Sequence, residues 1–166
     1  MRSAGVKPPL VRRASFEDAP ALLRLIERAL EKGARSHYRA DQRRAIYLSY
    51  ASVIYVDVVG DRYETLLADR QGQLVGMAQL DPSVGRLRAL FVDGPLQRQG
   101  IGRLLLAEVE ARAAKRGCQR LVGAMSRDAV PFYARAGFRP CLGPDRLNHF
   151  GVAVPVVTME KLLGPG

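Results

Sequence analysis

The sequence is poor in cysteine, histidine and tryptophan: it has two cysteines, two histidines and no tryptophan in 166 residues. Cys118 and Cys141 form no Cys-x-x-Cys pair, and the histidines are not clustered. A structural zinc site needs closely spaced thiolate or imidazole ligands, and a disulfide framework needs several cysteine pairs. The sequence therefore indicates neither a structural zinc site nor a disulfide framework. No metal is expected, and the two cysteines are expected to pack as small hydrophobic residues.

Long apolar runs are also missing. Stretches such as residues 104–107 are far shorter than the roughly 20 residues that cross a bilayer. The first seven residues, MRSAGVK, lack the apolar segment of a secretory signal peptide. We therefore expect no membrane association and a cytoplasmic location.

Acidic residues are few relative to basic ones: 16 aspartates and glutamates stand against 26 lysines and arginines, a net charge of +10. This excess favours a polyanionic partner, such as a nucleic acid, a membrane surface or a phosphate-bearing cofactor. The arginines are scattered along the chain, however, and no basic motif interleaved with aromatic residues is present. Nucleic-acid binding is therefore a weak alternative.

The chain length fits a single α/β domain, which we place at residues 10–163 behind a loose tail at residues 1–9. Its first half is mostly helical by hydrophobic periodicity. The expected elements there are a strand at 11–14, a helix from a capping box at 15–18 to Gly33, a helix capped by Asp41 that runs to about Leu48, and a region of ambiguous pattern at 50–61.

The second half changes to the period of strands. The expected elements are three antiparallel strands at 63–69, 73–80 and 86–92 with a tight turn at Gly72, a helix at 102–116, a strand at 119–124, a short helix at 129–136, and a last strand at 152–161.

A glycine loop lies between the strand that ends at Val92 and the following helix, and it reads Gln97-x-x-Gly100-x-Gly102. Unpaired amides and the helix dipole make such a position an anion site, and glycine lets the backbone approach a phosphate closely. A dinucleotide fingerprint would need a third glycine where Leu105 stands, and a Walker loop would need a Gly-Lys-Ser/Thr sequence. Neither NAD nor ATP is favoured.

The loop resembles the pyrophosphate-binding motif of the GCN5-related N-acetyltransferases (GNAT), Gln/Arg-x-x-Gly-x-Gly/Ala. Residues 87–92 before it are similar to the central strand of that family, and residues 117–124 after it are similar to the fifth. Residues 128–138, DAVPFYARAGF, then resemble the family's Asn-x-x-x-x-Phe-Tyr-x-x-x-Gly-Phe signature. The four elements occur in the family's order. The resemblance covers residues 63–138 strongly, and it covers the amino-terminal helix pair and the last strand loosely.

The resemblance implies an α/β fold with a mixed, mostly antiparallel sheet of six or seven strands and about four helices. It also implies that the sheet is splayed between its fourth and fifth strands, with acetyl-CoA in the gap. By position, backbone groups of Leu90, Phe91 and Val92 would bind pantetheine. The remaining implied cofactor residues are Gln97, Arg98, Gln99, Gly100, Ile101, Gly102 and Arg103 at the pyrophosphate, with Asp128 and Phe132.

Tyr133 matches the tyrosine that, in this family, donates a proton to the departing thiolate of coenzyme A. A positioned acid of this kind contributes about 10² to 10⁴ in rate. The partner base is harder to place, because many family members carry a glutamate in the central strand, whereas residues 85–92 contain no acid and have Arg88 instead. Asp128 also departs from the family's asparagine. The candidate bases are Asp81, Glu64, His37 and His149, and a water relay is an equal alternative.

Acceptor recognition is expected from residues 34–42 and from a loop at residues 143–151, with His37, Tyr38 and His149 on the substrate side. The resemblance implies direct acetyl transfer to a primary amine of a small molecule or peptide, and homodimers are common in the family. A catalytically degenerate module that binds acyl-CoA in a regulatory role is the alternative.

Overall fold

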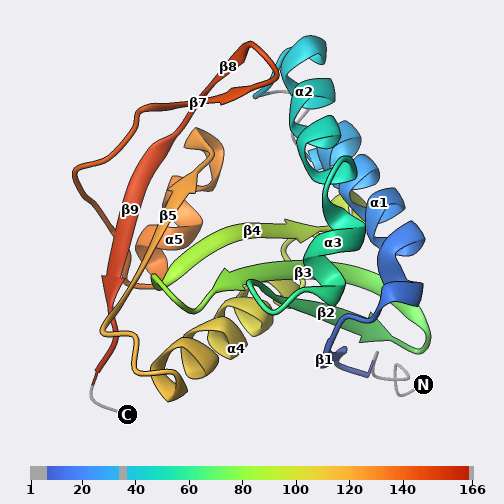
Figure 1. The fold of residues 1–166 in the computed structure, drawn as a ribbon, viewed down its shortest axis with the longest axis horizontal. Coiled ribbons are helices and arrows are strands. Elements are labelled where there is room, and N and C mark those ends of the chain that lie inside the picture. Colours follow the sequence, from blue (N-terminus) through green and yellow to red (C-terminus); the bar gives the residue numbers. More distant parts are fainter. Residues whose placement is uncertain (1–6, 34–36, 165–166) are drawn as a thin grey trace, which may run out of the picture.

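The structure is a computed structural model that describes residues 7–33 and 37–164, and within these residues it is an α/β fold with a mostly antiparallel seven-stranded sheet and five α-helices (Figure 1). The strand order is β1-β2-β3-β4-β5-β9-β6, with β7 and β8 as a separate pair. The strands are β1 (Leu10–Arg13), β2 (Glu64–Arg70), β3 (Gln73–Asp81), β4 (Arg86–Val92), β5 (Arg120–Met125), β6 (Arg139–Pro140), β7 (Arg146–His149), β8 (Val152–Pro155) and β9 (Val157–Leu162).

The helices lie on both faces of the sheet. They are α1 (Ala19–Arg28), α2 (Ala40–Ala51), α3 (Ile54–Val59), α4 (Ile101–Lys115) and α5 (Val130–Arg135). One core cluster packs α4 against β2 to β5, and a second packs α1 and α3 against the opposite face of β2 to β4. Apolar residues of alternating strand positions fill these two clusters, as expected for a sheet covered on both faces.

The expected start of α1 is confirmed by its contacts. The carboxylate of Asp18 accepts a hydrogen bond from the amide of Ser15 at 2.8 Å, which completes the capping box. The helix continues beyond Arg28 as one π-type turn at Ala29–Gly33. Asp41 does not cap α2, because the capping position is Arg39, whose amide donates to Gln42 at 3.0 Å.

Residues 50–61, which had no clear pattern, contain the end of α2 and all of α3. Two other expectations are wrong. Residues 143–151 are not a plain loop, because the β7–β8 hairpin begins there with Arg146 opposite Pro155. The expected last strand at 152–161 is two strands, β8 and β9, divided at Val156.

The sheet splits between β4 and β5. These two strands are parallel neighbours with one bridging pair, Arg86 opposite Val122, and they diverge beyond it (Figure 1). At the closed end a Cβ on Gly85 would lie 2.4 Å from the carbonyl oxygen of Arg120, so only glycine permits the approach. We call the space between the diverging strands the gap.

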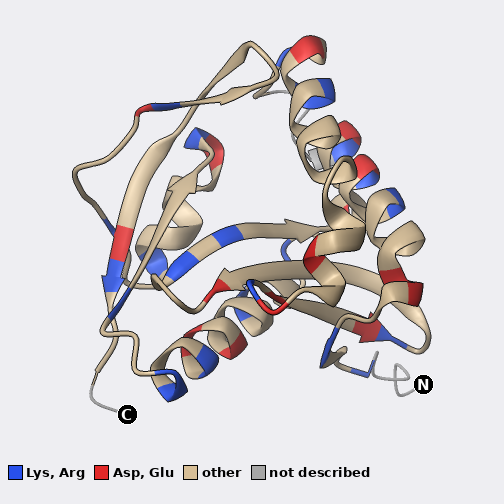
Figure 2. Ribbon diagram, viewed as in Figure 1, with Lys and Arg blue, Asp and Glu red and all other residues tan. Residues whose placement is uncertain are grey.

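Basic and acidic residues are interspersed along α1, α2 and α4 (Figure 2). No helix among the described residues has the length and apolarity of a membrane span. Within the same residues no group of histidine, cysteine and acidic side chains is arranged to hold a metal. Cys118 and Cys141 are free and half-buried, and the thiol of Cys118 donates to the carbonyl of Pro82 at 3.2 Å.

Candidate active site

The glycine loop forms the N-terminus of α4 beside the gap. Gly100 caps the helix with φ of 82°, and a Cβ built on it meets nothing within 4 Å. Arg98 also has a positive φ, 65°, which is strained for a residue with a side chain. Because the first-turn amides of a helix have no intrahelical acceptor, this loop presents free N–H groups and the positive end of the helix dipole to open space.

Side chains around the loop add uncompensated positive charge. Arg98 and Arg103 are exposed, and neither forms an ion pair within the described part of the chain. Gln97 is exposed, and Gln99 accepts a hydrogen bond from Arg70 at 3.2 Å. Ile101 is 1% exposed and packs in the core, so it can offer a ligand only its backbone. The loop is therefore a cationic surface built mainly from main-chain groups.

The side of β4 that faces the gap has a free backbone edge. Leu90, Phe91 and Val92 pair with Ala78, Met77 and Gly76 of β3, and β5 has already diverged from them. Unpaired N–H and C=O groups along a strand edge bind an extended chain that carries amides. This edge leads directly to the glycine loop.

Three separate elements meet where that edge reaches α4. A Cβ on Gly102 would lie 3.3 Å from the ring of Phe132 in α5 and 3.7 Å from the side chain of Leu90 in β4. Glycine at position 102 therefore lets the ring of Phe132 pack closely against the start of α4. The glycine loop, the free edge of β4 and α5 thus come together at one place.

Tyr133 follows Phe132 and is 6% exposed. Its ring makes edge contacts with Phe132 at 5.0 Å and with Phe138 at 5.4 Å between centroids. Burial raises the pKa of Tyr133, and the nearby Tyr50 adds to the shift. No hydrogen bond of its hydroxyl is present among the described residues. The phenol is thus held protonated with its hydroxyl uncommitted.

A polar cluster that the sequence did not reveal lies on the α3 side of β4. A bulge inserts Arg88 between the pairs Gln79–Ala89 and Leu80–Leu87, and bulges redirect side chains. The guanidinium of Arg88 pairs with the buried Asp57 of α3 and donates to Gln79 at 3.2 Å. It also lies 4.3 Å from the ring centre of Tyr63. The strand in which many family members carry a glutamate therefore presents an arginine that is already in an ion pair.

Tyr50 joins this cluster to the gap. Its hydroxyl donates to the carbonyl of Arg88 at 3.2 Å, and its ring contacts Phe91 edge-on at 5.3 Å. Burial raises the pKa of Tyr50 to about 12. No sequence signal for Tyr50 was available, because it opens the stretch whose pattern was ambiguous.

The substrate-side residues expected before α2 reach the far side of the gap. His37 lies 3.8 Å from the carboxylate of Asp128, and the hydroxyl of Tyr38 lies near Ser126, which follows the end of β5. Burial raises the pKa of Tyr38. Residues 34–36 of the expected recognition segment lie outside the described residues. Asp128 is thus in contact with the acceptor-side segment.

The β7–β8 hairpin spans the gap from β9 to α2 (Figure 1). Gln42 of α2 donates to the carbonyl of Ala153 at 3.1 Å, and Ser49 lies 2.7 Å from Nδ1 of His149. Burial lowers the pKa of His149. We call α2 and this hairpin together the acceptor wall, and the glycine loop with the free edge of β4 the cofactor wall.

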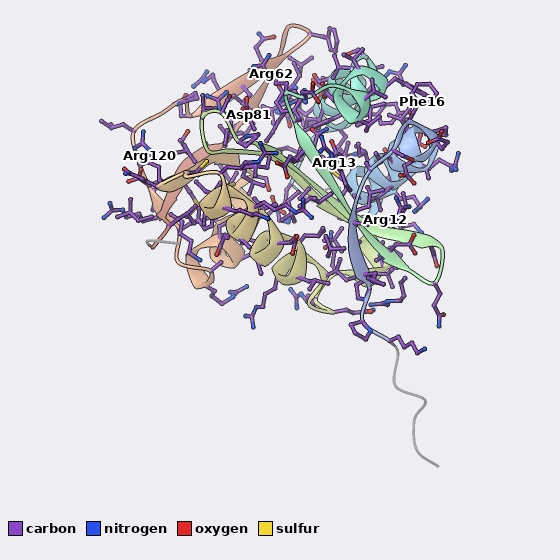
Figure 3. All side chains as sticks on the ribbon, turned by 60° about the horizontal axis from the view of Figure 1, so that its bottom comes forward. Arg12, Arg13, Phe16, Arg62, Asp81 and Arg120 are labelled. Atoms are coloured by element: carbon purple, nitrogen blue, oxygen red, sulfur yellow. The ribbon has the colours of Figure 1, made fainter. Side chains whose placement is uncertain are left out.

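Two of the expected base candidates lie at other places. Glu64 faces α4, where Arg112 and Arg116 hold its carboxylate at 3.3 and 2.7 Å. Asp81 ends β3 at the closed end of the sheet, beside Arg62 at 3.6 Å (Figure 3). Both carboxylates are committed to arginines outside the gap.

A split sheet with an anion-binding helix N-terminus at its opening defines a class of proteins that hold an extended, phosphate-bearing ligand between two halves of a sheet. The family model of the acetyltransferase (GNAT) domain matches residues 34–163. The chain therefore belongs to the GNAT acetyltransferase family, an enzyme family that transfers acetyl groups from acetyl-CoA.

Solved structures of this family share the fold. A GCN5-related N-acetyltransferase from Rhodopseudomonas palustris has a TM-score of 0.86 and 23% identity, with 97% of this chain and 99% of that one covered. The PaiA N-acetyltransferase from Thermoplasma acidophilum, solved in complex with coenzyme A, has a TM-score of 0.77 and 18% identity over 92% and 98% of the two chains.

A curated relative matches over a shorter stretch. The tRNA(Met) cytidine acetyltransferase TmcA from Aeropyrum pernix is 38% identical over 64 residues, which are 38% of this chain. The match spans 9% of the length of that protein.

Proposed function

We propose that the protein is an acetyl-CoA-dependent N-acetyltransferase that moves the acetyl group directly to a primary amine of a small molecule or peptide while both substrates are bound. The observation that carries this proposal is the meeting of Leu90, Gly102 and Phe132 at the open end of the gap, with Tyr133 beside them. Family membership alone would not distinguish an active enzyme from a binding module, whereas this arrangement would offer both a path for the cofactor and a proton donor.

The cofactor wall fits acetyl-CoA in its chemistry. The free amides from Arg98 to Arg103 and the two uncompensated arginines would hold the pyrophosphate. The edge at Leu90–Val92 would bond the amides of pantetheine, as an added strand does. Phe132 lies beside Gly102 on the same path, and Asp128 would meet the cofactor from the side of His37. The open space at Gly100 admits a phosphate where any side chain would stand in its way.

The amine has to react in its uncharged form. For an alkylamine with a pKa near 10.4, losing the proton at pH 7 costs roughly 4 to 5 kcal/mol. Holding the amine against the acetyl carbonyl offsets such costs, because oriented reactants reach effective concentrations that supply several kcal/mol. The acceptor wall, rather than the glycine loop, is therefore where the selectivity for the amine would lie.

Tyr133 would act as the proton donor to the leaving group, the thiolate of coenzyme A. Its raised pKa keeps the hydroxyl protonated throughout the physiological range, so a donor is always present. A thiolate with a pKa near 8.5 is a weaker base than such a phenolate, so complete transfer from an isolated Tyr133 is uphill. The tyrosine would therefore give its proton to the sulfur only in step with loss of a proton from the amine, and it would afterwards regain a proton from solvent.

A catalytically degenerate acyl-CoA-binding module is the second candidate. The observation in its favour is β4 itself, which has no acid between Arg86 and Val92 and presents Arg88 in an ion pair. Such a module would bind acyl-CoA through the cofactor wall without turnover. Turnover therefore separates the two candidates.

The test is an acceptor panel with purified protein and acetyl-CoA. Aliphatic amines and peptides with free N-termini represent the proposed class, and a cytidine-containing RNA is added because of the TmcA match and the net charge of +10. Thiol release and mass spectrometry of the acceptor are measured together, with a reaction lacking amine as the control for hydrolysis. We expect acetylated product from at least one primary amine. Binding of acetyl-CoA without transfer to any acceptor would favour the degenerate module.

A further inference from the structure

The contacts of the four candidate bases reduce their number. Glu64 and Asp81 are held by arginines outside the gap. The two histidines remain as candidate bases. One is in the segment before α2 and the other is in the β7–β8 hairpin. His37 lies opposite Asp128, and His149 lies opposite Ser49.

His149 faces the interior of the molecule. Along β7 and β8, Leu147, His149, Val152 and Val154 are half-buried or buried and share one face, whereas on the other face Arg146, Asn148 and Ala153 are exposed and Pro155 is half-buried. Val154 packs into a cluster with Ile46 of α2 that also contacts Tyr50 and Phe91 at the gap. Because alternate residues of a strand share a face, His149 is on the side of the hairpin that looks toward the gap.

The contacts of Ser49 favour one tautomer of His149. The hydroxyl of Ser49 lies 3.1 Å from the carbonyl oxygen of Ala45 and 2.7 Å from Nδ1 of His149. A carbonyl can only accept, and a serine has one hydroxyl hydrogen, so both contacts are hydrogen bonds at once when Ser49 donates to Ala45 and Nδ1 of His149 donates to Ser49. We take this arrangement as the basis of the inference. In the neutral ring this leaves Nε2 with a lone pair.

No acidic side chain is paired with His149 within residues 7–33 and 37–164. On the hairpin, Asp145 pairs with Arg146 at 3.3 Å. On α2, Asp41 pairs with Arg39, Arg43 bonds the carbonyl of Tyr38, and Arg44 is exposed. Strand β8 carries no titratable side chain. Burial alone therefore acts on the ring, lowers its pKa and keeps it neutral at pH 7.

We propose that His149 is the general base of the transfer and that Ser49 is the residue that positions it, an inference that rests on the proposed function. As the C–N bond forms, the nitrogen becomes cationic and one of its protons passes to Nε2 of His149. The C–S bond breaks and the sulfur takes the proton of Tyr133. His149 then releases its proton to solvent and Tyr133 regains one, so the sum is amine plus thioester to amide plus thiol.

The kinetic test is the pH dependence of kcat/KM for an acceptor found in the panel. Below the pKa of the amine, protonation of the amine gives a plot of log kcat/KM against pH a slope of about one. A base that must be neutral adds about one more to this slope below the pKa of the base. For wild type we expect the slope to steepen as the pH falls below the ordinary histidine value of 6.5, because the pKa of His149 is lowered. H149Q should lose the steepening and fall about 10² in kcat.

Three variants test the arrangement. S49A, which removes the hydrogen-bond acceptor of Nδ1, should lower kcat without weakening acetyl-CoA binding, and S49T should restore it by returning the hydroxyl. H37Q is the matched control and should keep the steepening. A wild-type profile in H149Q, or loss of the steepening in H37Q alone, would overturn the assignment of His149 while leaving the proposed function in place.

A measurement that needs no turnover tests the assignment of His149 separately from the proposed function. Nitrogen NMR of the histidine rings, with the His149 signals assigned by their loss in H149Q, should show Nδ1 protonated and Nε2 bare at pH 7. S49A should shift the equilibrium between the two neutral tautomers of His149. A ring protonated on Nε2 would contradict the inference even if no acceptor were ever found.

Discussion

The cofactor wall and the acceptor wall are built in opposite ways. The cofactor wall comes from a contiguous stretch, β4 and the start of α4, and it offers mainly backbone groups to a ligand. The acceptor wall depends on side chains that are 100 positions apart for Ser49 and His149, and 111 for Gln42 and Ala153. One wall can therefore keep its chemistry while the other changes.

This difference has a physical consequence for binding. Backbone amides and a helix dipole cannot be removed by substitution, so the cofactor wall is disturbed only where a side chain enters its space. The acceptor wall loses a contact with each altered side chain. Substitutions on the two walls should thus separate binding of acetyl-CoA from reaction with the amine.

The largest effect is expected for Tyr133→Phe, which removes only the proton donor between the walls. We expect kcat to fall by about 10² to 10⁴ with acetyl-CoA affinity unchanged, because the ring contacts with Phe132 and Phe138 remain. Steady-state kinetics and calorimetry measure the two quantities. Tyr55→Phe, on the exposed face of α3, is the control and should match wild type. Equal kcat values for both variants would remove Tyr133 from the reaction.

A smaller effect is expected for Asp57→Ala, which breaks the side-chain cluster behind β4. The guanidinium of Arg88 would lose its partner in a half-buried site, at a cost of about 1 to 3 kcal/mol in the free energy of unfolding. Urea unfolding measures this cost. Asp41→Ala removes the same carboxylate from the exposed pair with Arg39 and should leave the free energy of unfolding nearly unchanged. Equal losses in the two variants would show that burial of the Asp57 pair contributes nothing.

The smallest effect is expected for Asp18→Asn, remote from both walls. Hydrogen bonding to Arg12 lowers the pKa of Asp18 from 3.8 to about 2. A carboxyl whose pKa is lower in the folded state stabilises the fold above its unfolded pKa, and this stabilisation is lost as the pH falls toward 2. The variant should be less stable by at most about 1 kcal/mol at pH 7, and the difference should vanish near pH 2. A difference in melting temperature that grows on acidification would contradict this.

The strands and the larger helices could be predicted because their signals are local. The bounds of β4, the turn at Gly72 and the helix after the glycine loop follow from periodicity and turn residues, and the structure confirms them. The cofactor residues are contiguous, so a motif could name them, and their roles stay predictions until binding is measured.

The rest depends on tertiary pairing that a single sequence does not show. The β7–β8 hairpin has four residues in each strand and one exposed face, so its pattern resembles a loop. The side-chain partners of His149 and Arg88 are Ser49 of α2 and Asp57 of α3, and neither residue is part of a motif. Packing across long sequence separations, rather than local propensity, decides these contacts.

Titration of acetyl-CoA into wild type, Gly100→Glu and Gly117→Glu by calorimetry tests the cofactor wall most directly. Gly100 and Gly117 flank α4 with φ of 82° and 83°, and a Cβ on either meets nothing within 4 Å, so the strain and added charge match. Binding by wild type and Gly117→Glu, with loss in a folded Gly100→Glu, is the expected result. Equal binding by all three proteins, or none by folded wild type, would show that this loop does not hold the phosphates of acetyl-CoA.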